Sequence, residues 1–77
     1  MRIIGSLEHR PGIYAITHHA SGKQYVGSSQ DVQHRQYAHT SDLRLHRHGS
    51  IKLQRAYDKY GTDAFTFAAL GRVRKVW

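Results

Sequence analysis

The sequence lacks cysteine entirely and has a single proline among its 77 residues. Without cysteine, neither disulfide bonds nor thiolate metal sites can stabilise so small a domain. No run of about 18 apolar residues occurs, so we expect that no segment spans a membrane, and polar residues interrupt the N-terminus too early for a signal peptide. Acidic residues are also scarce, since five Asp and Glu stand against twelve Lys and Arg.

The excess of basic residues gives a formal net charge of +7 with histidine counted as neutral. A charge of this size on one small domain, residues 1–77, favours a polyanionic partner, and nucleic acid is the first candidate. An anionic membrane surface is less favoured, because no basic amphipathic helix with a strong apolar face stands out. The alternative is a basic surface that only water contacts.

A hairpin opens the predicted fold. Residues 13–17 and 24–27 are rich in β-branched and aromatic residues, and the segment between them contains Gly and Ser, which favour turns. We expect two antiparallel strands with Tyr14 on the first and Tyr25 on the second. Residues 1–11 are expected to form an irregular lead-in.

Two helices follow the hairpin. Residues 32–45 are predicted as the first helix, with the hydroxyls of Ser28 and Ser29 available as N-caps. Residues 51–60 carry apolar positions at helical spacing, and Ser50 can cap the helix that they form.

A third strand is predicted over residues 65–70, and the basic tail 71–77 either continues it or leaves it. The element order is then ββααβ. This order predicts an α+β domain with a three-stranded antiparallel sheet flanked by helices.

Five side chains that could bind and cut a phosphodiester are spread over these elements: Tyr14, Tyr25, Arg35, His39 and His48. The planar fork of arginine suits phosphate, and histidine accepts protons near neutral pH. Tyrosine becomes a competent base only beside a cation or metal. Each residue also has an ordinary interpretation, as cross-strand packing for the tyrosines and a solvated helix face for Arg35 and His39.

With this order of elements and these residues, the chain resembles the GIY-YIG nuclease family, in particular its phage homing-endonuclease branch. The resemblance runs from Pro11 to about Leu70. Val26 stands where the family name has isoleucine. The matching pieces are P-G-I-Y-A-I, G-K-Q-Y-V-G-S-S, D-V-Q-H-R-Q-Y-A-H-T, H-G-S-I-K-L-Q-R-A-Y-D-K-Y-G and F-T-F-A-A-L.

The resemblance implies a DNA endonuclease that uses a divalent metal, magnesium or manganese, and cuts with low sequence specificity. Tyr14 and Tyr25 are then the family tyrosines, one of which acts as or orients the base for the attacking water. Arg35 holds the scissile phosphate, and His39 and His48 match two further active-site histidines. A cytoplasmic location is implied as well, in the host cell if a phage encodes the protein.

Four further residues are expected to contact the nucleic acid: Gly27, Ser28, Lys52 and Arg55. Gly27 is expected to let the backbone turn tightly beside the site. Lys52 and Arg55 lie on the faces of the second predicted helix that point away from its apolar stripe, where they meet phosphate or water.

One feature of the family is missing. The family carries a metal-binding glutamate on a helix after the third strand, whereas the tail here has no carboxylate. The chain is then a fragment, or Glu8 or another chain supplies the carboxylate, or the domain is a non-catalytic DNA-binding module. Structural zinc is disfavoured, because His18 and His19 lie in a predicted turn and His46 and His48 lack companions at ligand spacing.

Overall fold

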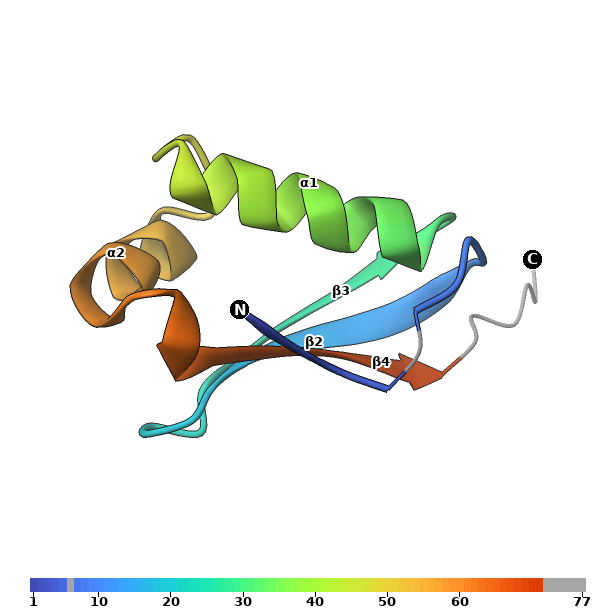
Figure 1. Cartoon of the computed structure of the whole chain (residues 1–77), viewed down its shortest axis with the longest axis horizontal. Coiled ribbons are helices and arrows are strands. Elements are labelled where there is room, and N and C mark those ends of the chain that lie inside the picture. The colour runs from blue at the N-terminus through green and yellow to red at the C-terminus, as the bar shows by residue number, and fades with distance from the viewer. Residues whose placement is uncertain (6, 72–77) are drawn as a thin grey trace.

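The computed structural model describes residues 1–5 and 7–71, so the predicted behaviour of the basic tail beyond Gly71 lies outside the described residues. Both helices lie on one face of the sheet (Figure 1), which confirms the α+β class. In chain order the elements are β1 (Arg2–Ile4), β2 (Gly12–His18), β3 (Gln24–Ser29), α1 (Val32–Arg44), α2 (Ile51–Tyr60), the 3-10 helix η1 (Thr62–Ala64) and β4 (Phe65–Gly71).

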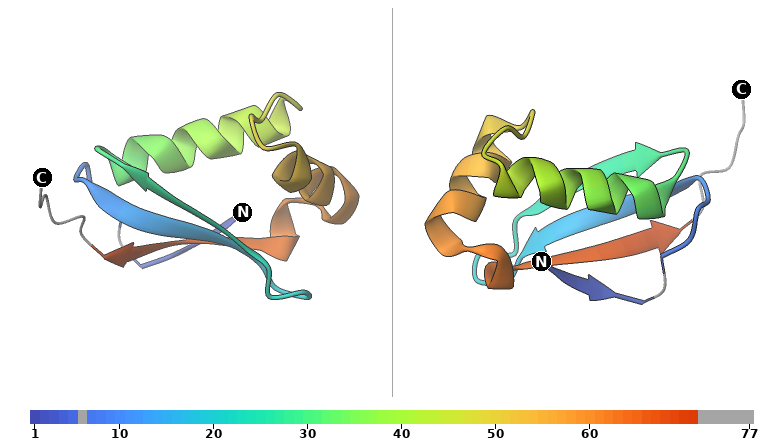
Figure 2. Two further views of the ribbon diagram at one scale, coloured as in Figure 1. Left: turned by 180° about the vertical axis from the view of Figure 1, so that it is seen from behind. Right: turned by 45° about the horizontal axis from the view of Figure 1, so that its top comes forward.

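The sheet has four strands in the order β1-β4-β2-β3, and it is mixed. The prediction of a three-stranded antiparallel sheet was therefore wrong, because β1 arises from the expected lead-in and pairs parallel to β4 (Figure 2). Three residues are too few to show strand alternation in a sequence. Residues 2–4 pair with β4 because β4 would otherwise present unpaired backbone groups at the sheet edge. The N-terminal amino group also donates to Thr62 Oγ1, which holds this segment beside the sheet.

The register of the hairpin places both tyrosines on the face that the helices cover. Tyr14 lies opposite Gly27, and Ile16 lies opposite Tyr25. Residues directly opposite one another share a face, and so do alternate residues of one strand. On the other side of β2, Phe67 lies opposite Ile16 and joins the same buried face.

The core lies between this face and the helices. Its buried side chains come from β2, β4 and both helices, and they are Tyr14, Ile16, Val32, Leu43, Leu53, Phe65 and Phe67. Helix α1 also buries a histidine there, because His39 is only 2 % exposed. A polar ring thus occupies a position on the sheet-facing stripe that apolar residues usually fill.

A short polar side chain caps the start of each helix. The cap predicted for α2 is confirmed, and the caps predicted for α1 were wrong. Ser50 caps α2 by accepting the N–H of Leu53 at 3.3 Å. The N-cap of α1 is Asp31, which accepts the N–H of His34 at 2.8 Å. Ser28 and Ser29 belong to β3 and so cannot cap this helix.

In the part of the chain that the structure describes, no helix is long and apolar enough to cross a membrane.

Candidate active site

Three side chains from separate elements form a hydrogen-bonded row, which consists of Tyr14, His39 and His48. Tyr14 Oη and His39 Nε2 are 2.5 Å apart, and His39 Nδ1 and His48 Nε2 are also 2.5 Å apart. The two imidazole rings stack with their centroids 4.8 Å apart. Strand β2, helix α1 and the loop after it therefore meet at one point.

Tyr25 completes the cluster from β3. Its ring meets those of His39 and His48 edge-on, with centroid distances of 5.5 and 5.8 Å. The structure thus brings together four of the five side chains for which the sequence predicts a catalytic role.

The direction of the hydrogen bonds in the row follows from the loop. The backbone N–H of Ser50 donates to His48 Nδ1 at 3.0 Å, so this nitrogen carries no proton. A neutral histidine has one N–H, hence His48 donates through Nε2 to His39. His39 in turn donates through Nε2 to Tyr14, whose phenol oxygen is the final acceptor.

Both histidines are poor proton acceptors in this setting. Burial lowers the pKa of His39 from its ordinary 6.5 to about 4, and the charges of His48 and Arg35 act in the same direction, against Asp42. Burial lowers the pKa of His48 as well, again opposed by Asp42. At neutral pH both histidines are therefore uncharged, which is the state that the hydrogen-bond directions assume.

Arg35 lies on α1 one turn before His39, and its side chain is exposed. Its charge nevertheless lowers the pKa of both His39 and His48, so the guanidinium lies within electrostatic reach of the row. An exposed cation beside two uncharged histidines is well placed to receive an anion from solvent.

Gly27 is a glycine because the phenol of Tyr14 fills the space beside it. A Cβ on Gly27 would lie 2.5 Å from Tyr14 Oη and 2.6 Å from Cζ. The expected role in a tight turn was wrong, because Gly27 lies within β3 directly opposite Tyr14. The missing side chain instead lets the two strands pair with the ring between them and the helices.

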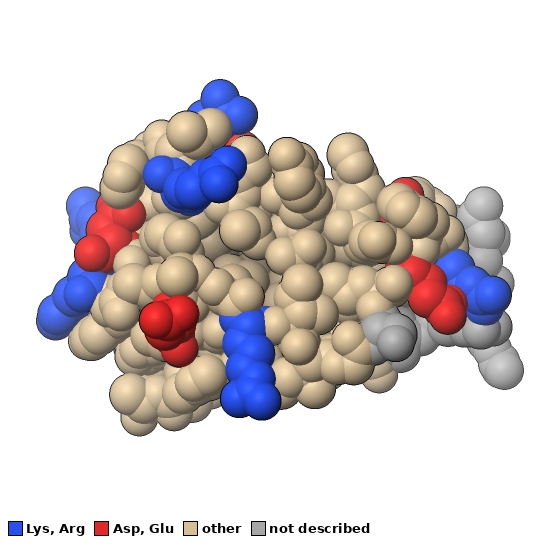
Figure 3. All heavy atoms as spheres, viewed as in Figure 1, with Lys and Arg blue, Asp and Glu red and all other residues tan. Residues whose placement is uncertain are grey.

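The other expected nucleic-acid contacts are scattered over the molecule. Ser28 lies opposite Ile13, which places it on the sheet face that points away from the row. Lys52 and Arg55 are exposed on α2, and Lys52 lies at the edge of a cavity that Tyr25 also lines. On the face shown in Figure 3, blue and red groups are both present with uncharged surface between them, so the positive charge is not continuous there.

Two residues for which the sequence predicts no part in the site hold His48 in place. Ser50 fixes its tautomer, and Gln54 fixes its backbone, since Oε1 of Gln54 accepts the His48 N–H at 3.0 Å. Nε2 of Gln54 donates to the carbonyl of Leu43 at 3.0 Å, which ties the loop to the end of α1. No pattern in the sequence separates this glutamine from a solvated helix residue.

The residues that the structure describes do not fit a divalent metal centre. They contain no group of three side chains that could hold a metal ion. The charge of Asp42 reaches His39 and His48, but its carboxylate pairs with Arg47 at 3.3 Å. Three other carboxylates also have basic partners, in the pairs Glu8 with Arg10, Asp31 with His9, and Asp58 with His46.

The family model of the GIY-YIG catalytic domain matches residues 10–71. The chain belongs to this family. The predicted resemblance is thereby confirmed, and the matched range contains the whole row together with Tyr25 and Arg35.

Two relatives of this chain are named as endonucleases. Intron-associated endonuclease 1 of Enterobacteria phage T4 is 44% identical over 52 residues, which cover 68% of this chain and 21% of that protein. Probable intron-encoded endonuclease 1 of Neurospora crassa is 34% identical over 61 residues, which cover 79% of this chain and 19% of that protein. The chain thus spans about a fifth of the length of the curated relatives it matches.

Two solved structures agree with the fold. The catalytic domain of homing endonuclease I-TevI is similar to this chain with a TM-score of 0.78 at 38% identity, covering 83% of this chain and 68% of that one. A mutant of the same domain has a TM-score of 0.76 at 39% identity, covering 83% and 65%.

Proposed function

We propose that this domain is a DNA endonuclease that hydrolyses phosphodiester bonds. Hydrolysis requires a group that takes a proton from water and a positive charge that meets the non-bridging oxygens of the phosphate. The single observation that carries the proposal is the row, which ends on the phenol oxygen of Tyr14 and whose two histidines lie within electrostatic reach of Arg35.

Tyr14 is the proposed base, and its phenol must first give up its proton to solvent before the oxygen can accept one from the attacking water. The row cannot remove the tyrosine proton, because Nε2 of His39 donates in this arrangement and the pKa of His39 is about 4. Instead, His39 donates a hydrogen bond to the oxygen that carries the negative charge. A donor fixed in this way stabilises and orients an anion.

The reaction then uses the groups of this chain as follows. The Tyr14 oxygen accepts a proton from water, the hydroxide attacks phosphorus, and the bond from phosphorus to the leaving oxygen breaks. Arg35 binds the non-bridging oxygens through the attack, and the leaving oxygen takes its proton from solvent. Tyr25 packs edge-on against the histidine pair and supports it from that side.

A divalent ion, Mg²⁺ or Mn²⁺, stays a prediction from the family. The carboxylates to hold it would come from outside the described residues, and another chain or domain is one source. We therefore assign no step to a metal. Specificity is proposed to be low, since phosphate contacts by basic residues carry no direct sequence information.

A second candidate function is a DNA-binding module without catalysis. It is favoured by the pairing of Glu8, Asp31, Asp42 and Asp58 with basic residues. In that case the row and Arg35 bind the phosphate but no bond is broken.

Nicking of supercoiled plasmid by the 77-residue chain separates the two functions. Tyr14→Phe keeps the ring and removes the proposed base, so nicking should fall by about 100-fold or more. Tyr37→Phe is the matched control, because Tyr37 is 69% exposed on α1. Equal nicking by the wild type and Tyr14→Phe would overturn the assignment of the base, and no nicking by the wild type would favour the binding module.

A further inference from the structure

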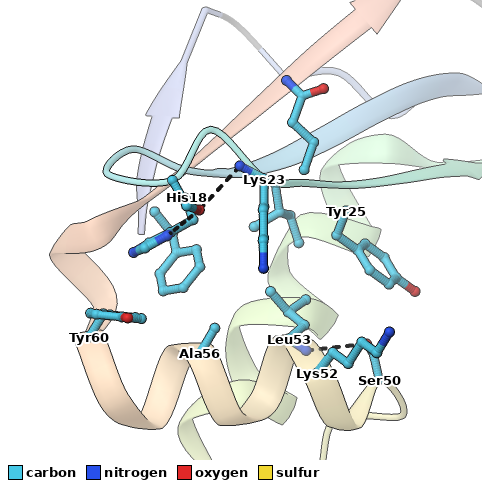
Figure 4. A pocket seen from close by; sticks show the side chains of 12 residues that line it. His18, Lys23, Tyr25, Ser50, Lys52, Leu53, Ala56 and Tyr60 are labelled. Carbon is cyan, nitrogen blue, oxygen red and sulfur yellow. Dashed lines mark hydrogen bonds between the residues drawn. The ribbon is translucent and has the colours of Figure 1, made fainter.

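A cavity of about 350 Å³ lies between the β2–β3 turn and helix α2, next to the row. Its floor is apolar, since the buried side chains of Ile16, Leu53 and Phe65 line it. Its edges are basic, and Figure 4 shows Lys23 directed from the hairpin into the space above Leu53. Lys52 lies on the opposite side, on α2. The volume falls in the range of small-ligand sites, which commonly combine an apolar lining with a few polar groups.

One wall of the cavity is aromatic. The ring of His18 lies 4.4 Å from that of Tyr60 and 5.2 Å from that of Phe65, measured between centroids. His18 is 8% exposed, and its Nδ1 is hydrogen-bonded to Ser21 Oγ at 2.7 Å, which holds the ring in position. Tyr60 is half exposed, and besides His18 its ring meets Lys59, whose Nζ lies 5.1 Å from the ring centroid and adds a further positive charge at this wall. Flat aromatic surfaces of this kind stack on nucleobases regardless of base identity.

Tyr25 connects the cavity with the row. Its ring lines the cavity and also meets the rings of His39 and His48. A phosphate that Arg35 holds at the row is then separated from the cavity only by the side chain of Tyr25. A neighbouring nucleotide of the same strand can reach the cavity with its base.

From this placement we infer that the cavity binds the base of an unpaired nucleotide next to the phosphate that is cut, with the nucleotide phosphate beside Lys23 and Lys52. The inference rests on the proposed function and specifies its substrate. A paired base must first leave the helix stack, which costs free energy and costs least where the nucleotide is already mismatched or single-stranded. The domain therefore prefers DNA with an unpaired nucleotide beside the cleavage site.

Binding is tested without cleavage by titrating the labelled chain with deoxyadenosine monophosphate and following backbone amides by NMR. Shifts are expected at Lys23, Ala56 and Tyr60. Tyr60→Leu should weaken binding by about fivefold or more, the low end of the loss of one stacking ring, and Lys23→Gln should weaken it as well, because it removes the charge beside the nucleotide phosphate. Tyr37→Leu is the control with unchanged affinity. Inorganic phosphate that reproduces the same shifts with equal affinity overturns the base site, as does wild-type affinity in Tyr60→Leu.

Substrate preference is tested by nicking of two duplexes that differ by one unpaired adenine beside the cleaved bond. The wild type should cut the duplex with the unpaired adenine about fivefold faster or more, and Tyr60→Leu should lose the preference. Equal rates by the wild type overturn the inference while leaving the nuclease intact. Nucleotide binding without any nicking supports the cavity and overturns the proposed function instead.

Discussion

The phenol oxygen of Tyr14 lies 2.5 Å from Nε2 of His39, a residue 25 positions further along the chain. This contact joins the first strand of the hairpin to the middle of α1. Because His39 is the donor, the phenol oxygen of Tyr14 is the acceptor in this contact. The proposed role of Tyr14 as the base depends on that direction.

Gly27→Ala should destabilise the fold through Tyr14. The added Cβ would lie 2.5 Å from Tyr14 Oη, so the strand or the ring must shift, at a cost of about 1–3 kcal/mol in the free energy of unfolding. Urea denaturation measures this cost. The matched control is Gly49→Ala, since no atom lies within 4 Å of a Cβ at Gly49.

A double-mutant cycle identifies the cause. Gly27→Ala should cost much less in a Tyr14→Leu background, because the phenol that it meets is gone. An equal cost in both backgrounds would show that Gly27 is needed for the backbone alone.

Acid should destabilise the domain through His39. The pKa of His39 is about 4 in the folded state against 6.5 when unfolded, so the unfolded chain binds more protons between these values. Stability is then complete above pH 6.5 and decreases as the pH falls toward 4, by on the order of 3 kcal/mol for this residue. Urea denaturation between pH 7.5 and 4.5 measures the slope.

The variant His39→Gln should show a flatter pH profile over the same range. The pKa of Asp31 is also lowered, but its effect is confined to pH values below about 3.8, its ordinary value, and does not enter this window. A wild-type stability that stays constant from pH 7 to 5 would contradict the uncharged, buried state of His39.

Binding to duplex DNA should depend steeply on salt and weakly on sequence. The formal charge of +7 is spread over many basic side chains, and each neutralised phosphate releases counterions. Affinity should fall by about tenfold or more between roughly 50 and 200 mM salt. Fluorescence anisotropy with two unrelated duplexes measures both effects, and an affinity that is insensitive to salt argues against the electrostatic account.

The chain alone should nick slowly in Mg²⁺ or Mn²⁺. Magnesium binds weakly without a protein carboxylate, and the described residues hold no metal cluster. Glu8→Gln and Asp42→Asn identify any carboxylate that contributes. Fast nicking that Glu8→Gln abolishes would place the metal ligand in the N-terminal segment, and fast nicking that survives both variants would show that the site works without either.

The sequence predicts most of this site because its signals are local. Turn residues and β-branched runs define the hairpin around Tyr14 and Tyr25, and helical spacing places Arg35 one turn from His39. Strand β1 escaped prediction, because a three-residue strand depends on the edge of β4, which is far away in the chain. The cap formed by Ser50 was predicted, but the contact of Ser50 with His48 and that of Gly27 with Tyr14 escaped, since both exist only after folding.

The most direct test of a nuclease site on this domain compares cleavage and binding for Arg35→Ala. Plasmid nicking should fall by about 100-fold, because Arg35 meets the phosphate during the attack. Duplex affinity should change little, since many other cations contribute to it. Arg35→Lys should restore nicking only in part, because the planar fork is lost, and Arg44→Ala at the far end of α1 should leave both unchanged. Equal losses of nicking and affinity in Arg35→Ala would contradict the account and make Arg35 a docking residue only.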